Sequence, residues 1–372
     1  IMNYSIIIPN KNRADLISKL LETLFVARKN IQSSTEVLVI DDSNEENAKK
    51  IEESARKYDC KVITKACSVA QKRNYGASLA TYDTLLFLDS DVRVPPDLLI
   101  EYDKVYEEKK ARAAVGALEF EGKKYWYWDV VNASPFTKCF YMPKGEPDLK
   151  WGCSCNISVE KKLFNEVGGF CEDFKYPAGE DVDFGLRISD RHIKIYSAPK
   201  AVVYHSNETW RHYRDMRKRV SVYGKADVLL VKKHPEQVVN SGMFRRVAMY
   251  WSILILAVLF AALQQCWWLL LAPVGYYAIE NIGVALIAKH EYKRFGKISL
   301  LKELAVQHLI HINERAYMRQ CILSGKFSYL NKQLIYSYGQ ACSTLKFSRY
   351  TMFLQWFLYL ITLTAVVILA II

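Results

Sequence analysis

An apolar stretch, Leu85–Leu88, ends on two aspartates separated by one residue, Asp89 and Asp91. Alternation along an extended chain places both carboxylates on the same side, where each raises the pKa of the other unless a cation lies between them. Hard oxygen ligands without a neighbouring thiolate suit Mg²⁺ or Mn²⁺, and such an ion typically holds a diphosphate. The pair therefore predicts a divalent metal site, while capping of the helix after Pro95 is the alternative for Asp91.

Alternating strand and helix patterns position this pair. Strand-type runs alternate with helical periodicity in the order 4–8, 15–26, 37–40, 48–58, 61–64, 69–79 and 84–88. This order predicts βαβ units and an α/β fold of the doubly wound type. Ligands bind beyond the carboxyl ends of the strands in such sheets, so the polar residues that follow each strand are the candidates for a site.

Composition changes sharply beyond residue 240. The chain of 372 residues is 51% hydrophobic with a net charge of +12, and charges are interspersed throughout its first part. Three later stretches are long and apolar enough to cross a bilayer, namely residues 247–263, 267–288 and 351–372. We therefore predict a catalytic domain over 1–240 and a membrane region over 241–372, with an interfacial amphipathic helix near 298–324. A buried helix is the alternative for the first and shortest stretch.

Basic residues flank two of these stretches on one side: Arg245, Arg246, Lys289, Lys293, Arg294 and Lys297. Basic loops face the cytoplasm in membrane proteins. Nine cysteines, an odd number at irregular spacings, with no secretory signal ahead of the first strand, favour the same reducing compartment. The sequence thus predicts a multi-pass protein of the cell membrane whose catalytic domain is cytoplasmic.

A series of further motifs resembles family 2 glycosyltransferases over about residues 3–235. The residues that carry the resemblance are Asp41-Asp42, Arg73-Asn74 with Gly76, Asp89-Ser90-Asp91, Trp151-Gly152, Asn156, Gly168-Gly169-Phe170 and Gly179-Glu180-Asp181. The resemblance implies a GT-A fold, a nucleotide-sugar donor, a metal at the D-x-D pair and inversion at the anomeric carbon.

The resemblance also implies a donor site, carried over by position to Pro9, Asn10, Arg13, Asp42, Arg73, Asp89 and Asp91. Asp42 matches the acidic residue that recognises the nucleotide base, and a carboxylate suits the imide of uracil. Arg73 matches an arginine near the diphosphate, where a cation offsets phosphate charge; an ordinary charged helix residue is the alternative. Asp91 matches the firm metal ligand, and Asp89 lies toward the ribose and the metal.

Glu180 and Asp181 open a predicted helix. A sugar hydroxyl is a poor nucleophile at neutral pH, so displacement of a nucleoside diphosphate needs a carboxylate that takes the proton as the bond forms. The resemblance implies that Asp181 is this base, that Glu180 orients the acceptor hydroxyls, and that Trp151 and Asn156 lie on the acceptor side. Acidic residues also stabilise the positive end of a helix, and this capping role is compatible with catalysis.

A strand pattern at Val202–Tyr204 ends in His205. In related enzymes a histidine here completes the metal sphere, for which imidazole is acceptable to Mn²⁺; a hydrogen-bonded structural histidine is the alternative. Arg214 and Arg217 follow, and they are candidates to bind the leaving diphosphate, an acceptor phosphate or an anionic membrane surface, with solvated surface charge as the alternative. The Q-x-x-R-W motif of processive synthases has no match, which argues against long-chain polymerisation.

The sequence therefore predicts an inverting, Mn²⁺- or Mg²⁺-dependent glycosyltransferase of the hexosyltransferase type. We expect a UDP-linked donor, a polyprenyl-diphosphate-linked glycan or another amphiphile as acceptor, membrane lipids as partners, and no nucleic acid. A shorter resemblance to mycofactocin glycosyltransferases over Tyr223–Pro235 favours a peptide or small-molecule acceptor as the alternative. A non-catalytic nucleotide-binding assembly subunit is the alternative from a different class.

Overall fold

The computed structural model describes residues 2–123, 125–210, 212–291, 298–335 and 344–371. The chain divides into two compact units. The first comprises the chain up to Tyr125 together with Pro135–Asp215, and the second comprises Trp126–Ser134 and the described chain from Met216 onward. Lys293, Arg294 and Lys297, which entered the prediction of orientation, lie outside the described residues.

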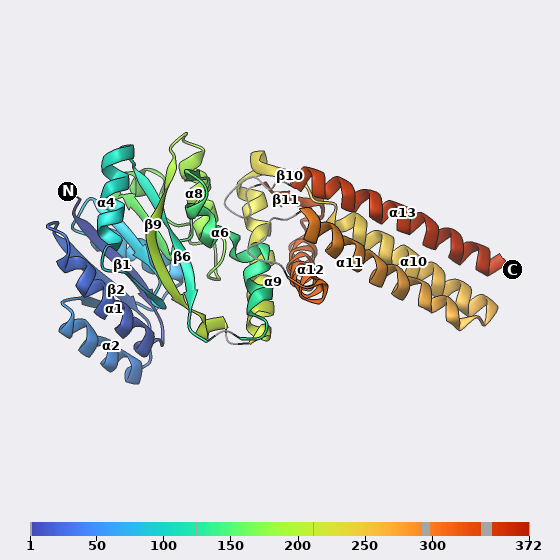
Figure 1. Ribbon diagram of the computed structural model, residues 1–372, viewed down its shortest axis with the longest axis horizontal. Coiled ribbons are helices and arrows are strands. Elements are labelled where there is room, and N and C mark those ends of the chain that lie inside the picture. Colours follow the sequence, from blue (N-terminus) through green and yellow to red (C-terminus); the bar gives the residue numbers. More distant parts are fainter. Residues whose placement is uncertain (1, 124, 211, 292–297, 336–343, 372) are drawn as a thin grey trace. The chain divides into compact units, whose positions relative to one another are not determined.

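The first half of the first unit is a run of βαβ connections (Figure 1). The strands are β1 (Tyr4–Asn10), β2 (Thr35–Asp41), β3 (Lys61–Thr64) and β4 (Thr84–Leu88), and the helices between them are α1 (Ala14–Lys29), α2 (Glu45–Lys57) and α3 (Val69–Leu79). The strands are parallel in the order β3-β2-β1-β4. Their carboxyl ends therefore meet at one edge of the sheet, as predicted.

Strands of mixed direction extend the sheet beyond β4. In the described residues the sheet has nine strands, and after β4 come β8 (Asn156–Glu160), β6 (Ala113–Glu121), β9 (Ile195–Ser206) and β5 (Val92–Arg93), with β7 (Asp148–Leu149) also paired to β9. β8 is antiparallel to β4 and to β6, whereas β6 and β9 are parallel to each other. The helices of this half are α4 (Leu98–Lys109), α6 (Lys138–Tyr141), α7 (Lys161–Glu166) and α8 (Glu180–Ser189). The predicted α/β class is confirmed, with a mixed rather than wholly parallel sheet.

An aromatic cluster fixes α8 against the sheet. Phe184 of α8 packs on Phe170 with ring centroids 4.6 Å apart, and Phe170 in turn meets Phe87 of β4 edge-on at 5.1 Å. All three side chains are almost fully buried. Burial of each ring contributes roughly 2–3 kcal/mol, so the start of α8 is held close to the end of β4.

The second unit is helical. Its main elements are α5 (Trp128–Ala133), α9 (Tyr213–Lys233), α10 (Met243–Gln264), α11 (Leu271–Glu291), α12 (Leu300–Leu323) and α13 (Thr344–Ile371), with a small ladder of β10 (Val238–Asn240) and β11 (Lys332–Leu334). α10, α11 and α13 pack side by side (Figure 1).

Three stretches of this unit are long and apolar enough to cross a membrane, namely Met243–Gln264, Trp267–Lys289 and Arg349–Ile371. Their outward faces carry exposed large apolar side chains, among them Ile255, Leu286 and Phe353. Water does not favour such faces and hydrocarbon does, so these helices indicate membrane association. The three predicted candidate spans are confirmed by length and composition.

The predicted boundary near residue 240 falls inside the helical unit. Val228 and Val231 of α9 pack with Met243 of α10 and with Tyr317 and Cys321 of α12. α12 covers most of the predicted helix over 298–324, and it buries polar as well as apolar side chains. The boundary, and the interfacial placement of α12, stay predictions.

Candidate active site

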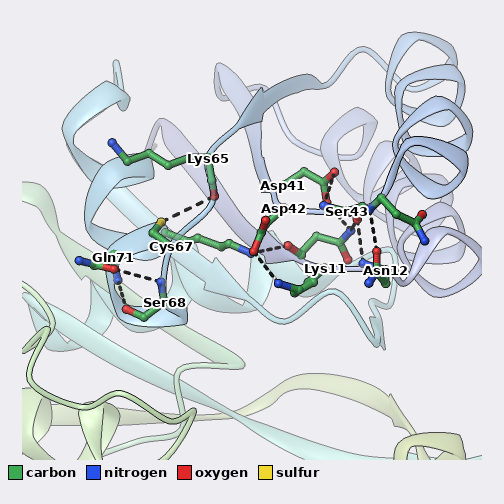
Figure 2. A network of polar contacts seen from close by, with 12 residues as sticks. Lys11, Asn12, Asp41, Asp42, Ser43, Lys65, Cys67, Ser68 and Gln71 are labelled. Carbon is green, nitrogen blue, oxygen red and sulfur yellow. Dashed lines mark hydrogen bonds and ion pairs between the residues drawn. The ribbon is translucent and has the colours of Figure 1, made fainter.

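The two aspartates after β2 have different surroundings (Figure 2). Asp41 is buried, and its Oδ1 accepts hydrogen bonds from the Asn10 amide at 2.8 Å and from the Ser43 hydroxyl at 2.7 Å. Asp42 is partly exposed, and its Oδ2 lies 2.8 Å from Lys11 Nζ. The hydrogen bond from Lys11 holds the pKa of the Asp42 carboxyl below its ordinary value. Asp41 thus stabilises the turn that follows β2, whereas Asp42 remains ionised and partly exposed at the carboxyl end of this strand.

Pro9 and Asn10, the predicted wall beside Asp42, form the buried end of β1. The Asn10 carbonyl accepts a hydrogen bond from Lys72 Nζ at 2.7 Å, and Lys72 Nζ lies 3.8 Å from Asp42 Oδ2. Burial lowers the pKa of the Lys72 ammonium, and the charge of Asp42 opposes this shift. Lys72 therefore adds a cation at this edge that the sequence analysis missed; its place near the start of α3, the helix that follows β3, was the available signal.

Asp91 lies between Arg13 and His205. The antiparallel pairing of β5 with β9 sets Val92 opposite His205, which brings the histidine next to Asp91 although 114 positions separate them in sequence. Asp91 Oδ2 is 2.7 Å from Arg13 Nη1, and Asp91 Oδ1 is 3.4 Å from His205 Nε2. The structure thus brings together three of the residues predicted for the donor and the metal.

The surroundings of Asp91 fit a divalent cation. His205 Nδ1 is 2.8 Å from the Ser206 carbonyl, which can only accept, so Nδ1 carries a proton and Nε2 is the nitrogen whose lone pair a metal ion would use. Asp91 Oδ1, which faces that lone pair, is buried and accepts no hydrogen bond from the described residues. Two lone-pair donors that face each other suit a cation between them, and a carboxylate with an imidazole suits Mn²⁺ better than Mg²⁺.

Arg73 of α3 connects the predicted donor side of the site, at Asp89, with the predicted acceptor side, at Glu180. Its buried guanidinium donates from Nη2 to Asp89 Oδ1 and from Nη1 to Glu180 Oε1, each at 2.8 Å. Burial raises the pKa of Asp89, but Arg73 and His205 together hold it below its ordinary value. Both terminal nitrogens of Arg73 therefore neutralise carboxylates, and any charge it directs at a diphosphate is shared with them.

Asp181 has a pKa raised to about 7. Burial is the largest cause and the charge of Glu180 is the next, whereas Arg73 and the backbone N–H groups of Val182 and Ser154 act in the opposite direction. The Val182 N–H donates to Asp181 Oδ1 at 2.9 Å. A carboxyl group that ionises near neutral pH has the affinity for a proton that a general base needs.

Glu180 opens α8 after Gly179, whose φ of +89° lies in the region that favours glycine. Glu180 is buried, its Oε1 is bound to Arg73, and its Oε2 has no hydrogen-bond partner among the described residues. An unpaired buried carboxylate oxygen is costly unless a ligand completes it. The arrangement leaves one acceptor atom beside Asp181, which a hydroxyl group would satisfy.

Trp151 and Asn156, predicted for the acceptor side, are both buried. Trp151 backs onto α8, where a Cβ at Gly185 would lie 2.3 Å from the Trp151 Cβ, so the close approach requires glycine. The Asn156 amide donates to carbonyls of β6 and β9 at 3.0 and 2.8 Å, and its Oδ1 accepts from the Tyr102 hydroxyl at 2.8 Å. These bonds occupy the polar groups of the side chain, so Asn156 joins strands and positions the site from within.

Arg214 and Arg217, predicted for a diphosphate, lie exposed in the first turns of α9. Within the described part of the chain, neither makes a hydrogen bond or an ion pair. Arg214 falls in the first compact unit and Arg217 in the second. A common diphosphate site for the two stays a prediction.

Comparison with known proteins gives a family match. Residues 5–168 match the model of glycosyl transferase family 2. A validoxylamine A glucosyltransferase of Streptomyces hygroscopicus is 27% identical over 291 residues, which cover 65% of this chain and 65% of that protein. A glucosyl-dolichyl phosphate glucuronosyltransferase of Haloferax volcanii is 25% identical over 179 residues, which cover 45% of this chain and 52% of that protein.

Among solved structures, a mannosyltransferase of Pyrobaculum calidifontis in complex with GDP-Man and Mn²⁺ covers 88% of this chain and 87% of its own, with 13% identity and a TM-score of 0.49. The chain thus spans 65% of the length of its Streptomyces relative and 52% of that of its Haloferax relative. Taken with the mixed sheet, the family match confirms the predicted GT-A fold. Residues 5–168 thus form a segment that matches glycosyl transferase family 2, and the relatives support a glycosyltransferase.

Proposed function

We propose that this chain is a membrane-attached, inverting glycosyltransferase that moves a sugar from a UDP-linked donor to an amphiphilic acceptor. The observation that carries the proposal is Asp181, a half-buried carboxyl with a pKa of about 7 in a chain that matches this family over residues 5–168. The names of both relatives describe sugar transfer, which agrees with the reaction class.

In the proposed reaction Asp181 takes the proton of an acceptor hydroxyl while that oxygen attacks the anomeric carbon of the donor sugar. The bond from the anomeric carbon to the diphosphate oxygen breaks on the opposite face, so the configuration inverts and the nucleoside diphosphate leaves. The open Oε2 of Glu180 accepts a hydrogen bond from the acceptor and orients it. Arg73 keeps Glu180 and Asp89 in place through its two hydrogen bonds.

On the donor side, the ionised Asp42 accepts from the imide N–H of uracil, and Lys72 lies beside it. Asp91 and His205, with Asp89 nearby, would hold Mn²⁺ or Mg²⁺, and the ion would offset the charge of the diphosphate. Arg13, bound to Asp91, contributes a further cation at the same edge.

The membrane part of the proposal rests on the three apolar helices. Confinement of enzyme and acceptor to one surface raises their effective concentration, which favours an amphiphilic acceptor such as a polyprenyl-diphosphate-linked glycan. The name of the Haloferax relative, with its dolichyl phosphate, supports this class. The name of the Streptomyces relative supports the second candidate, a small-molecule acceptor. We further propose that the catalytic unit faces the cytoplasm, because Arg245, Arg246 and Lys289 flank the spans.

Membranes that contain the chain, incubated with a panel of labelled nucleotide sugars and Mn²⁺ and then extracted for lipids, test the proposal. Membranes with Asp181→Asn are the matched control. Label in the lipid fraction that requires Asp181 supports an amphiphilic acceptor, and label confined to the aqueous fraction supports the small-molecule alternative. Neither transfer nor metal-dependent donor hydrolysis would instead favour a non-catalytic assembly subunit.

A further inference from the structure

A chain of polar side chains crosses the three apolar helices of the second unit. Gln355 of α13 donates from Nε2 to Glu280 Oε1 of α11 at 2.9 Å, and Arg245 of α10 donates from Nη2 to Gln355 Oε1 at 3.3 Å. Glu280 and Gln355 are both buried. This chain of side chains begins at Arg245, the third residue of α10, and reaches Glu280, the fourteenth of the 23 residues of its candidate span, so it runs from the end of one span toward the middle of another. The Arg245 end lies at the depth of lipid phosphates.

α12 adds further charges beside the Arg245 end. Glu314 of α12 forms an ion pair with Arg246 of α10, and Arg315 Nε donates to the His311 carbonyl at 3.2 Å. His311 is buried, and after burial the charges of Arg246 and Arg315 lower its pKa further. The ring is therefore neutral, and it lies in a positive potential.

A fourth arginine lies on α9, which packs against α12: Asn313 Nδ2 of α12 donates to the Val220 carbonyl of α9 at 3.0 Å, and Arg217 lies three residues before Val220. After burial, the charges of Arg217 and Arg315 lower the pKa of His308 further. Arg217, Arg245, Arg246 and Arg315, all within the second unit, form what we call the four-arginine cluster. Two carboxylates, Glu280 and Glu314, take part in the contacts described above.

The positive charge of the cluster is only half balanced. Arg217 and Arg315 are exposed, and within the described residues neither has a carboxylate within ion-pair distance. Arg245 Nε is buried and has no hydrogen-bond partner among the described residues. An ordinary solvated surface would leave the guanidinium groups in water, whereas here one donor, Arg245 Nε, is buried. The cluster therefore suits a ligand with an anionic, multi-oxygen head.

We propose that the four-arginine cluster binds the phosphate of a membrane amphiphile whose apolar chain lies along the spans. Guanidinium groups bind phosphate oxygens through paired N–H donors, which explains the use of arginine rather than lysine at all four positions. The phosphate could come from a polyprenyl phosphate or from an ordinary anionic phospholipid. The inference depends on the proposed function only for the identification of this amphiphile as the acceptor.

The full chain, purified in detergent, is titrated with polyprenyl monophosphate, with the uncharged polyprenol, with phosphatidylglycerol and with inorganic phosphate. The test variant is Arg217→Gln/Arg315→Gln, because among the described residues neither arginine pairs with a carboxylate, so their loss leaves no buried acid without its partner. The matched control is Lys218→Gln/Arg319→Gln, which removes the same charge from exposed neighbours on the same two helices. Arg217→Lys/Arg315→Lys restores the charge but not the paired donors, and thermal unfolding checks the fold of each variant.

We expect a phosphate-bearing amphiphile to bind more tightly than polyprenol, and its affinity to fall about tenfold in the glutamine variant, the scale of one charge-assisted hydrogen bond. The control variant should stay within about twofold, and the lysine variant should recover part of the loss. Preference for polyprenyl phosphate assigns the site to an acceptor-type lipid, and equal binding of phosphatidylglycerol assigns it to bulk lipid. Equal affinity for polyprenol, or an equal loss in the control, overturns the proposal.

A separate measurement keeps this inference distinct from the proposed function. Asp181→Asn should bind polyprenyl phosphate like the unchanged chain, because Asp181 does not belong to the cluster. Phosphate-dependent binding without sugar transfer from any donor would remove the proposed function and leave the cluster as a lipid site. Transfer to a lipid that is insensitive to the glutamine variant would remove the cluster and leave the proposed function.

Discussion

The ends of β2 and β4 each carry two carboxylates, and at both ends the two carboxylates have different surroundings and different roles. After β2, Asp41 is buried in hydrogen bonds from Asn10 and Ser43, while Asp42 is ionised and partly exposed. After β4, Asp89 is bound by the buried Arg73, while Asp91 keeps an oxygen without a hydrogen bond. In each pair one carboxylate, Asp41 or Asp89, stabilises the fold through hydrogen bonds, and we call it the holding acid. The other, Asp42 or Asp91, is available to a ligand, and we call it the ligand acid.

This difference shows why the residue type at a motif position does not by itself determine the function of that residue. Asp89 and Asp91 follow the same strand, yet the hydrogen bonds that each makes come from different elements: α3 in one case, the loop before α1 in the other. At each strand end the holding acid is bound by a buried donor, Asn10 or Arg73, whereas the ligand acid is partly exposed or keeps an oxygen without a hydrogen bond. Substitution should therefore affect stability at one acid and ligand affinity at the other.

The largest effect is expected at Asp91. Asp91→Asn removes the charge that faces His205, and we expect the affinity for UDP in the presence of Mn²⁺ to fall by about a hundredfold, the scale of one strong charge-assisted contact. Calorimetric titration with and without Mn²⁺ measures it. If the metal strengthens UDP binding as much in the variant as in the unchanged chain, Asp91 is not a metal ligand.

A large loss of stability is expected at Asp89. Asp89→Asn removes one of the two carboxylates that are hydrogen-bonded to the buried Arg73 guanidinium, and we expect a loss of about 2–3 kcal/mol in the free energy of unfolding. Denaturant titration of Asp89→Asn beside Asp91→Asn measures the difference. An Asp91 variant that is the less stable of the two would break the comparison between holding and ligand acids.

A smaller pair of effects is expected after β2. Asp41→Asn should lower stability by about 1–2 kcal/mol, because the Asn10 amide and the Ser43 hydroxyl lose a charged acceptor. Asp42→Asn should leave the melting temperature nearly unchanged and weaken UDP binding by roughly tenfold. Thermal melts and UDP titrations of both variants sharpen the comparison; equal UDP affinities would mean that Asp42 does not contact the base.

A separate effect concerns the pH dependence of stability. The folded-state pKa of Asp181, about 7, lies above the ordinary value of 3.8, so protonation stabilises the fold in the window between them and the contribution is lost as pH rises toward 7. Asp181→Asn should therefore raise the melting temperature above about pH 7, and the gain should shrink as pH falls. A gain that is independent of pH would contradict a raised pKa.

Much of the architecture could be predicted from the sequence, because hydrophobic periodicity and the turn-forming residues between elements are local features. The βαβ order, the three candidate spans and the placement of Asp42 and Asp91 at strand ends all follow from runs of a few residues. The β5–β9 pairing that sets His205 beside Asp91 depends on tertiary structure, and here the motif resemblance supplied the histidine.

Other parts of the site were not accessible from the sequence. The bridge from Asp89 through Arg73 to Glu180 includes the contact between Arg73 and Glu180, which are 107 positions apart, and no local pattern encodes it. Lys72 was overlooked because a lysine on a helix is usually solvated, whereas burial and the Asn10 carbonyl hold this one inside. Asn156 shows the reverse case, since a motif position turned out to be occupied by hydrogen bonds within the sheet.

The central claim is that Asp181 takes the proton of the acceptor. Initial rates of sugar transfer with Asp181→Asn, measured against donor and acceptor separately beside Glu180→Gln, test it most directly. The account predicts a fall in turnover of about a hundredfold to ten-thousandfold for Asp181→Asn with unchanged donor binding, and mainly a raised acceptor KM for Glu180→Gln. Near-normal turnover of Asp181→Asn together with an inactive Glu180→Gln would contradict it.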